Sequence, residues 1–232
     1  MNARNKLEER ESRARLYPSI TNPHWLVLRA RREIFRRWLN SVSAPGMMVL
    51  DIGGRIQPYR SLMLDKDTRY IAVDLRLTSL VDVIADANRL PFSEARYDLV
   101  ICTQVLQYVS NPFETVAEIR RVLKPGGFLL LSVPSLYPSD SSIDGWRCFP
   151  AALRQLTAEF SAVEIAAEGG SVVGLFRTLN VWLDWFARPA FLKSLIRHTA
   201  IPMFNLAAVL LESATRKRNE TFSPNFSVLA RR

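Results

Sequence analysis

The sequence predicts an α/β protein built on a doubly wound, mainly parallel sheet. From residue 47 onward, short β-rich runs alternate with helical patterns; the runs cover 47–52, 70–75, 81–86, 97–103 and 127–133. The first, fourth and fifth runs are apolar almost throughout, as expected of parallel strands that helices cover on both faces. The 232 residues, 48% of them hydrophobic, suffice for one well-filled domain and are too few for two large ones.

The connection between the fourth and fifth runs carries the clearest helix signals. Asn111 and Pro112 form a typical helix start. The Lys-Pro-Gly-Gly run at 124–127 ends the helix, since Gly126 and Gly127 can take the positive φ of a tight turn into the next strand. A crossover helix between neighbouring parallel strands follows from this pattern.

The rest of the chain extends this core. A helix is predicted over 150–160, a strand over 163–167 and a last strand over 225–232, with inserted helices over 170–219. We therefore divide the chain into four parts. They are a basic helical segment (1–46), a cofactor-binding core (47–168), a helical insert (169–220) and the last strand of the core sheet (221–232).

The net charge of +9 is concentrated at the two ends of the sequence. The net charge is +6 over residues 1–46, −2 over 47–165 and +5 over 166–232. An anionic partner or substrate would therefore be attracted by the terminal elements rather than by the centre.

Localisation signals are sparse. The first sixteen residues alternate in charge sign and do not resemble a secretory signal peptide. The longest apolar stretch, 200–211, is about half of the ~20 residues that a membrane span needs, so no transmembrane helix is expected and an interfacial one stays open. Cys102 and Cys148 have neither disulfide nor metal-ligand spacing. We expect a cytoplasmic protein without a metal, with the inner face of the membrane as an alternative location.

Acidic residues follow the first three predicted strands. Asp51 precedes Gly53 and Gly54, Asp74 lies twenty-three residues later, and Asp86 closes the third run. Ligands of open parallel sheets bind at the carboxyl ends of the strands, and an acid at about this spacing commonly accepts hydrogen bonds from ribose hydroxyls. Each residue alone could equally form a turn or a helix cap. Together they favour a cofactor that contains a nucleoside.

Three stretches identify a family resemblance: VLDIGGRIQPYRSL, YIAVDL, and the block from DVIADANRLPF to RVLKPGGFLLLSVP. In this order they resemble a class I S-adenosylmethionine-dependent methyltransferase of the type 11 group. The resemblance implies a seven-stranded Rossmann-like sheet whose last two strands are antiparallel, and S-adenosylmethionine as the cofactor.

The resemblance also implies roles for residues at the strand ends. Asp51 and Gly53 would lie against the methionine part of the cofactor, Asp74 against the ribose, Asp86 against the adenine amine, and Gln104 near the sulfonium. The full set of implied cofactor-binding residues is Asp51, Gly53, Gly54, Arg55, Asp74, Leu75, Asp86, Ala87 and Gln104.

Arg55 departs from the family pattern, which commonly has a second glycine at this position. The side chain either turns outward or meets the cofactor carboxylate, where a guanidinium can make a bidentate contact. The second arrangement is slightly favoured, because the substitution would otherwise add steric cost without gain.

The loop after the fifth run, PSLYPSDSSIDGWRCF, is the expected acceptor wall. It resembles a loop of bacterial methyltransferases associated with surface polysaccharide or glycolipid synthesis, although Asp140 stands near where a histidine would be expected. Asp140 or Asp144 could act as a base, Tyr137 and Trp146 could contact a sugar, and Arg147 could hold an anionic group. A loop with Asx turns and a packed tryptophan is an equally good reading of each residue.

The remaining histidines and the first amphipathic helix complete the candidate residues. His24 and His198 are expected to be surface or packing residues rather than catalysts. The segment WLVLRARREIFRRWLN has one apolar side, and Arg31 falls within it. Arg31 therefore either extends to solvent or points into the acceptor pocket.

A second amphipathic helix is predicted in the insert, in the segment GLFRTLNVWLDWFAR. Its broad apolar face contains Trp182 and Trp185, opposite a polar strip of Arg177, Asn180 and Asp184. Core or partner packing, including a homodimer contact, ranks first for this face, and interfacial membrane binding ranks second.

Three functions remain open at this point. The first is O-methylation of a glycan or lipid-linked intermediate by S-adenosylmethionine. The second is methylation of RNA such as tRNA, although no RNA-binding module is recognisable and nucleic acid is the less favoured partner. The third is a degenerate cofactor-binding scaffold without activity.

Overall fold

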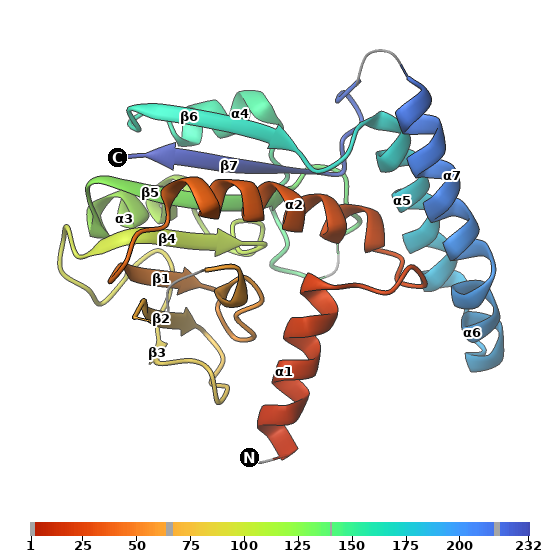
Figure 1. Ribbon diagram of the computed structural model, residues 1–232, viewed down its shortest axis with the longest axis horizontal. Helices are drawn as coiled ribbons and strands as arrows, with labels where there is room; N and C mark the ends of the chain where they lie inside the picture. Colours follow the sequence, from red (N-terminus) through yellow and green to blue (C-terminus); the bar gives the residue numbers. More distant parts are fainter. Residues whose placement is uncertain (1–2, 64–66, 140, 216–218) are drawn as a thin grey trace.

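The computed structural model describes residues 3–63, 67–139, 141–215 and 219–232. A seven-stranded sheet forms its centre, in the order β3-β2-β1-β4-β5-β7-β6 (Figure 1). β7 runs antiparallel to both of its neighbours, and the pairings among β1 to β5 are parallel. The predicted fold class is confirmed. The strands are β1 (Met48–Ile52), β2 (Arg69–Asp74), β3 (Val83–Ile84), β4 (Tyr97–Thr103), β5 (Leu123–Pro134), β6 (Ala162–Ala167) and β7 (Asn225–Arg231).

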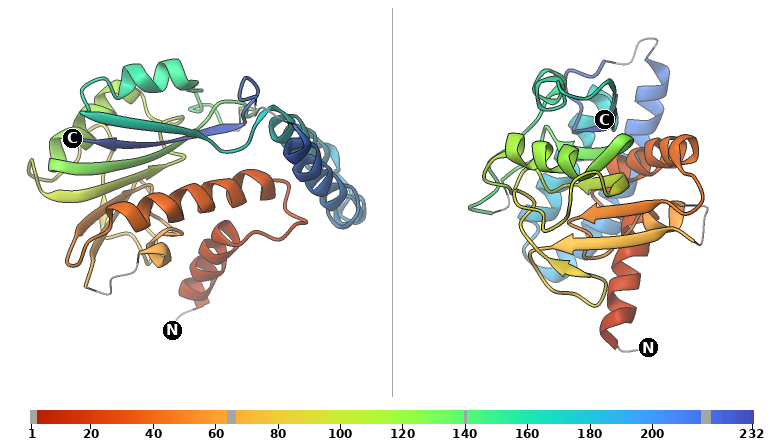
Figure 2. Two further views of the ribbon diagram at one scale, coloured as in Figure 1. Left: turned by 45° about the horizontal axis from the view of Figure 1, so that its top comes forward. Right: turned by 90° about the vertical axis from the view of Figure 1, so that its left-hand side faces the viewer.

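Helices cover both faces of the sheet and one of its ends. α2 crosses one face, α3 and α4 lie on the other, and α5 to α7 stand together beyond the ends to which the β1, β2 and β4 arrows point (Figures 1 and 2). α1 extends away from the sheet beside a short 3₁₀ turn, η1 (Arg60–Leu62). The helices are α1 (Ala3–Leu16), α2 (Trp25–Val42), α3 (Pro112–Val122), α4 (Pro150–Leu156), α5 (Ser171–Phe186), α6 (Ala190–His198) and α7 (Ala200–Ala214).

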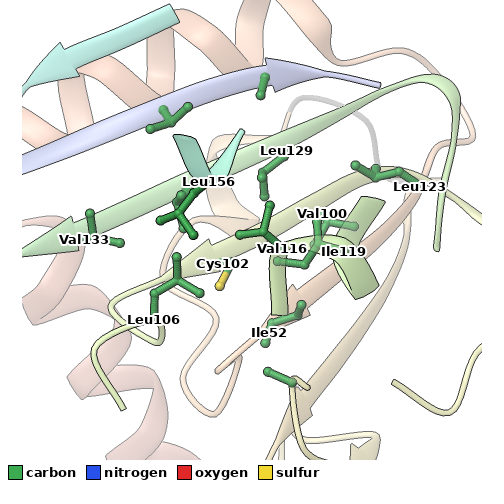
Figure 3. Close-up of a cluster of buried hydrophobic side chains, with 14 of the residues drawn as sticks. Ile52, Val100, Cys102, Leu106, Val116, Ile119, Leu123, Leu129, Val133 and Leu156 are labelled. Atoms are coloured by element: carbon green, nitrogen blue, oxygen red, sulfur yellow. The ribbon is translucent and has the colours of Figure 1, made fainter. Parts of the chain in front are cut away.

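The apolar strands supply two hydrophobic layers because successive side chains point to opposite faces. Val100 and Cys102 of β4 pack with Ile119 of α3, whereas Leu99 and Ile101 pack under α2. Figure 3 shows the first layer, where Val100, Ile119 and Leu156 come from the sheet, α3 and α4. The continuous apolar runs are therefore explained by burial on both faces.

The predicted start and end of the crossover helix are also observed. The Asn111 side chain accepts hydrogen bonds from the backbone N–H groups of Phe113 and Glu114 at the start of α3. Gly126 has φ +80, while a Cβ on Gly127 would lie 3.0 Å from the Lys124 carbonyl oxygen. Gly126 thus supplies the positive φ, and Gly127 permits close backbone approach.

Three predicted elements have boundaries that differ from the structure by more than one residue. β3 shortens to Val83–Ile84, and α4 ends at Leu156 rather than at residue 160, because the chain then turns to pack Phe160 into the core. β5 begins at Leu123, which pairs with Tyr97; pairing then resumes between Phe128 and Leu99 after the glycine turn.

The insert helix α5 turns its apolar tryptophan face outward, whereas packing of that face against the core would turn it inward. Trp182 and Trp185 are 54% and 58% exposed, whereas Arg177, Asn180 and Asp184 are buried. The polar strip faces inward because it finds partners there. Asn180 Nδ2 donates to Asn205 Oδ1 of α7 at 2.9 Å. The expectation of core packing for the tryptophan face is therefore wrong.

The C-terminal helices form a longer apolar segment than the stretch 200–211 considered in the sequence. Among the described residues, the 25-residue segment Ala190–Ala214 is long and apolar enough, by length and composition, to cross a membrane. Only 17% of its most apolar window is buried. α7 nevertheless packs on the domain, since Asn205 is buried and its Nδ2 donates to the Ile20 carbonyl at 2.7 Å. The segment is therefore the outer layer of the insert in this structure.

Candidate active site

A cavity of about 800 Å³ opens where the parallel strands end, between the sheet and helices α1, α2 and α5. One end is bordered by the loops after β1, β2 and β3, and the other by the helices that carry the terminal positive charge. The predicted cofactor residues that line it are Gly53, Arg55, Asp74, Leu75, Asp86, Ala87 and Gln104. The structure thus brings most of that set together.

Gly53 forms the part of the wall where backbone reaches the cavity. Its φ is +76, and a Cβ at this position would lie 2.4 Å from Val105 Cγ2. The Gly53 N–H donates to the Val73 carbonyl at 2.8 Å, which fixes the turn against β2. The absent side chain lets Val105 pack against the turn, and the Gly53 backbone then borders the cavity at the strand end where nucleoside cofactors bind.

Asp51 and Gly54 lie beneath this turn rather than in the cavity wall. Asp51 is 2% exposed and accepts a 2.6 Å hydrogen bond from the Tyr70 hydroxyl. A Cβ on Gly54 would lie 2.9 Å from the Asp51 carboxyl carbon. Burial raises the pKa of Asp51 to about 7, although the Tyr70 hydrogen bond opposes that shift. Asp51 therefore supports the glycine turn from behind.

This shifted carboxyl predicts a pH-dependent stability. Its folded pKa lies above its unfolded value, so between about pH 4 and pH 7 the folded state binds more protons and is destabilised as pH rises. We expect the free energy of unfolding of Asp51→Asn, minus that of the wild type, to increase by up to about 4 kcal/mol across this range. Urea unfolding at several pH values measures the difference. A difference that does not change with pH for Asp51→Asn would contradict the assignment.

Asp74 and Asp86 lie at the cavity rim. Asp74 Oδ1 accepts from the Arg76 N–H at 2.8 Å, and Asp86 Oδ1 accepts from the Asn88 N–H at 2.9 Å. The local turns considered from the sequence are therefore present. Both residues also line the cavity, Asp74 from the end of β2 and Asp86 from the loop after β3. Their positions suit hydrogen bonds to the hydroxyl and amine groups of a nucleoside.

Gln104 lines the cavity and has an unusual backbone conformation. Its φ is +56, although it is not glycine. The Gln104 N–H donates to the Ser132 carbonyl at 2.8 Å, and Nε2 donates to Ser132 Oγ at 3.1 Å. Strained residues of this kind persist where the surroundings fix them, and they concentrate at functional sites. This placement is compatible with the position near the reacting group that the family resemblance implies.

Arg55 lines the cavity and has an exposed side chain. The Arg55 carbonyl accepts from Thr78 Oγ1 at 3.0 Å, which positions the backbone at the mouth of the glycine turn. A contact from the guanidinium to the cofactor carboxylate remains a prediction. We expect Arg55→Ala to weaken S-adenosylmethionine binding about tenfold, the order of one charge-assisted hydrogen bond, in calorimetric titration. Arg89→Ala, an exposed arginine outside the cavity lining, is the control. An unchanged affinity for Arg55→Ala would contradict the contact.

The opposite end of the cavity is lined by residues that the sequence interpretation had largely placed elsewhere. Arg31 is buried and makes an ion pair with Glu168, with Nη2 2.8 Å from Oε2. Arg31 also lines the cavity, together with Arg15, Arg177 and His24. Of the two open orientations for Arg31, the structure has the one toward the pocket.

His24 lies in this wall rather than on the open surface. Its ring centroid is 6.0 Å from that of Tyr137. Burial, followed by the charges of Arg177 and Arg15, lowers the pKa of His24 to about 4. The imidazole is therefore neutral at pH 7. The sequence offered no periodic pattern to indicate this, because His24 precedes its helix.

The predicted acceptor loop is held together by its own polar side chains. Arg147 pairs with Asp144, and its Nε donates to the Tyr137 carbonyl at 3.0 Å. Trp146 Nε1 donates to the Val109 carbonyl at 3.0 Å. Tyr137 lines the cavity, whereas Asp144, Trp146 and Arg147 do not. Asp140 lies outside the described residues.

The sheet order, the glycine turn and the acidic rim are similar to those of class I methyltransferase domains. Residues 50–131 match the family model described as a methyltransferase domain. S-adenosylmethionine is the cofactor of this class, and the cavity fits it, with the Gly53 backbone and the acids of the rim in its wall.

Curated relatives match the same core. A demethylmenaquinone methyltransferase of Renibacterium salmoninarum is 34% identical over 116 residues, which cover 42% of this chain and 47% of the relative. A malonyl-[acyl-carrier protein] O-methyltransferase of a Marinomonas species is 35% identical over 85 residues, covering 35% of this chain and 32% of the relative. The chain thus matches at most about half the length of these relatives.

Solved structures share the fold over more of the chain. An S-adenosylmethionine-dependent methyltransferase from Archaeoglobus fulgidus has a TM-score of 0.55 at 14% identity, covering 87% of this chain and 94% of that one. The [4+2]-cyclase SpnF has the same TM-score at 16% identity, covering 87% and 80%. A cyclase on this fold means that the architecture alone does not define the reaction.

Proposed function

We propose that the protein is an S-adenosylmethionine-dependent methyltransferase that O-methylates a glycan or lipid-linked intermediate. The observation that carries this proposal is the single cavity that joins an acidic, glycine-lined cofactor end to an end lined by His24, Arg31 and Arg177. A cofactor and a second, chemically different molecule can therefore occupy adjacent parts of one space.

Methyl transfer depends mainly on how the acceptor atom is aligned with the methyl group. S-adenosylmethionine supplies an electrophilic methyl group on its sulfonium. The protein must hold the acceptor oxygen in line with that group, at the position that Gln104 borders. An alcohol also needs help in losing its proton at neutral pH. Asp144 is engaged by Arg147, and the neutral imidazole of His24 lines the end of the cavity that would hold the rest of the acceptor.

The lipid-linked part of the proposal is supported by the outward side of α5 to α7, which we call the apolar face. Its exposed side chains include Trp182, Trp185, Phe186, Phe191, Leu195 and Leu210. Trp182 and Phe186 stack with ring centroids 4.9 Å apart. Arg188 is exposed between α5 and α6, and Lys193 is 38% exposed. Tryptophans beside cations are typical of helices that lie in the interface of an anionic membrane.

The position of this surface relates it to the acceptor end. α5 contributes Arg177 to the cavity and Trp182 to the apolar face. An acceptor anchored in a bilayer would therefore reach the cavity across one helix. We therefore include in the proposal that the protein binds peripherally to the inner face of a membrane.

Vesicle binding tests the apolar face. We expect Trp182→Gln/Trp185→Gln to reduce partitioning into vesicles of phosphatidylglycerol and phosphatidylcholine at least tenfold, because two exposed indoles lose their interfacial contact. Flotation measures the bound fraction. Phe113→Gln, which removes an exposed aromatic residue of α3, is the matched control. Equal binding of the double variant and the wild type would rule out the apolar face as the membrane contact.

Transfer of a radioactive methyl group from S-adenosylmethionine into separated cell fractions tests the reaction itself. We expect label in glycolipid or lipid-linked saccharide. Label in RNA alone would favour the RNA methyltransferase alternative, and label in protein alone would also contradict the proposal. Calorimetric titration with S-adenosylhomocysteine addresses the scaffold alternative, because a domain that fails to bind it cannot carry the proposed activity.

A further inference from the structure

Positive side chains from three helices converge at the acceptor end of the cavity. Arg15 comes from α1, Arg31 from α2 and Arg177 from α5, and His24 lies in the same wall. These residues are far apart in the sequence, so only the tertiary structure brings them together. Such a convergence into one cavity focuses a positive potential on whatever enters it.

Arg31 is already neutralised within the protein. Its Nε donates to both carboxylate oxygens of Glu168 at 2.9 Å, and Glu168 also accepts from Ser132 and Ser227. Glu168 is fully buried and is satisfied by these donors. The pair therefore fixes α2 against the sheet. Because Glu168 is paired with Arg31, it makes no ion pair with Arg15 or Arg177.

Arg177 lies in a different environment. Its side chain is buried, Nη1 donates to the Leu136 carbonyl at 2.7 Å, and its Cζ lies 4.4 Å from the centroid of the Tyr137 ring. Nε has no hydrogen-bond partner among the described residues. Asp184, the nearest acid along α5, pairs with Arg197 at 2.5 Å and with Lys193 at 3.3 Å.

A buried guanidinium with an unused donor is costly unless an anion reaches it. The guanidinium of Arg177 matches the geometry of oxyanions, and a second cation, the exposed Arg15, lines the same cavity. Two cations favour a group with more than one negative charge. Among biological acceptors this charge is typical of a phosphate ester or a diphosphate.

We propose that Arg177, Arg15 and His24 form a subsite for the phosphate or diphosphate group of the acceptor. The inference rests on the proposed function, since it names the chemistry of the molecule that shares the cavity with the cofactor. Arg177 supplies the buried donors, Arg15 adds charge at the mouth, and His24 donates or accepts according to its protonation.

The two histidines of the chain make this subsite directly observable. His24 faces Arg15, Arg31 and Arg177, with Asp184 as the opposing charge, whereas His198 is exposed at the end of α6. In histidine-labelled protein at pH 7, inorganic pyrophosphate should shift the His24 imidazole resonances saturably and leave those of His198 in place. A bound anion should also raise the pKa of His24, because it stabilises the charged imidazole.

Arg177→Gln is the decisive variant, with Arg188→Gln as its matched control. We expect Arg177→Gln to weaken pyrophosphate binding at least about tenfold, and Arg188→Gln to bind as the wild type does. Arg177→Gln should also raise the pKa of His24 in the free protein. If Arg177→Gln does not fold, Arg15→Gln at the solvent side carries the same test with a smaller expected loss.

Titration with S-adenosylhomocysteine separates this inference from the proposed function. Failure of pyrophosphate to perturb His24 in a protein that binds S-adenosylhomocysteine would overturn the subsite alone. Equal pyrophosphate affinity of Arg177→Gln and Arg188→Gln would overturn it as well. A protein that binds pyrophosphate at His24 but does not bind S-adenosylhomocysteine would retain the subsite and lose the proposed function.

Discussion

Gly53→Ala should raise the dissociation constant for S-adenosylhomocysteine more than tenfold. The substitution adds a Cβ where the backbone has φ +76, and this Cβ would lie 2.4 Å from Val105 Cγ2. The left-handed conformation alone costs roughly 1–2 kcal/mol in a residue with a Cβ. Relieving the clash must move either the turn or Val105, and both line the cavity. Calorimetric titration measures the loss of affinity.

Gly46→Ala is the control for the backbone component. Gly46 has φ +70, similar to that of Gly53, yet a Cβ there would meet nothing within 4 Å. It precedes β1 at the opposite end of that strand from Gly53. We expect Gly46→Ala to lower the free energy of unfolding by roughly 1–2 kcal/mol and to leave cofactor affinity unchanged. Equal affinities of the two variants would show that Gly53 has no role in binding.

Arg31→Met should destabilise the protein by about 3–5 kcal/mol. The substitution leaves Glu168 as a buried carboxylate without its cationic partner, and breaking such a pair on one side typically costs this much. Arg31 also donates to Asn225 at 3.0 Å in the amide orientation that satisfies both residues. Urea unfolding measures the change in free energy.

Arg37→Met on the same helix is the matched control. The Arg37–Glu164 pair spans 3.5 Å, and both side chains are more than half exposed. Exposed pairs contribute about 0–1 kcal/mol, so the loss should be small. Arg31→Met/Glu168→Gln should be more stable than Arg31→Met, because no uncompensated charge stays buried. If the double variant is no more stable, the loss comes from packing rather than from charge.

Much of the sheet could be predicted because its signals are local. A strand covered on both faces must be apolar on both sides, which is why 97–103 and 127–133 are recognisable without any contact information. The start of α3 depends on Asn111 and Pro112, which act within one turn. Strand pairing in β5 was less accessible, since Leu123 becomes a strand residue only through Tyr97 on β4.

The cofactor end was predictable for a related reason. Asp74 and Asp86 end neighbouring parallel strands or their loops, so their common location follows from the topology. Asp51 shows the limit of this argument. Strand alternation turns its side chain toward Tyr70 beneath the glycine turn, and proximity in sequence to Gly53 does not place it in the cavity.

The sequence by itself determined the strands, the glycine turn and the acidic rim, because each depends on side-chain alternation or on residues close in the chain. Only the tertiary structure decided the acceptor end. The pattern of α5 defines two faces, but it does not say which one is buried. Asn205 of α7 and the cavity wall select the polar strip of Asn180 and Arg177 for the inside, and this leaves Trp182 outside. Contacts with residues far away in the sequence therefore decide that Arg177 of this helix lines the cavity and that its apolar face is exposed.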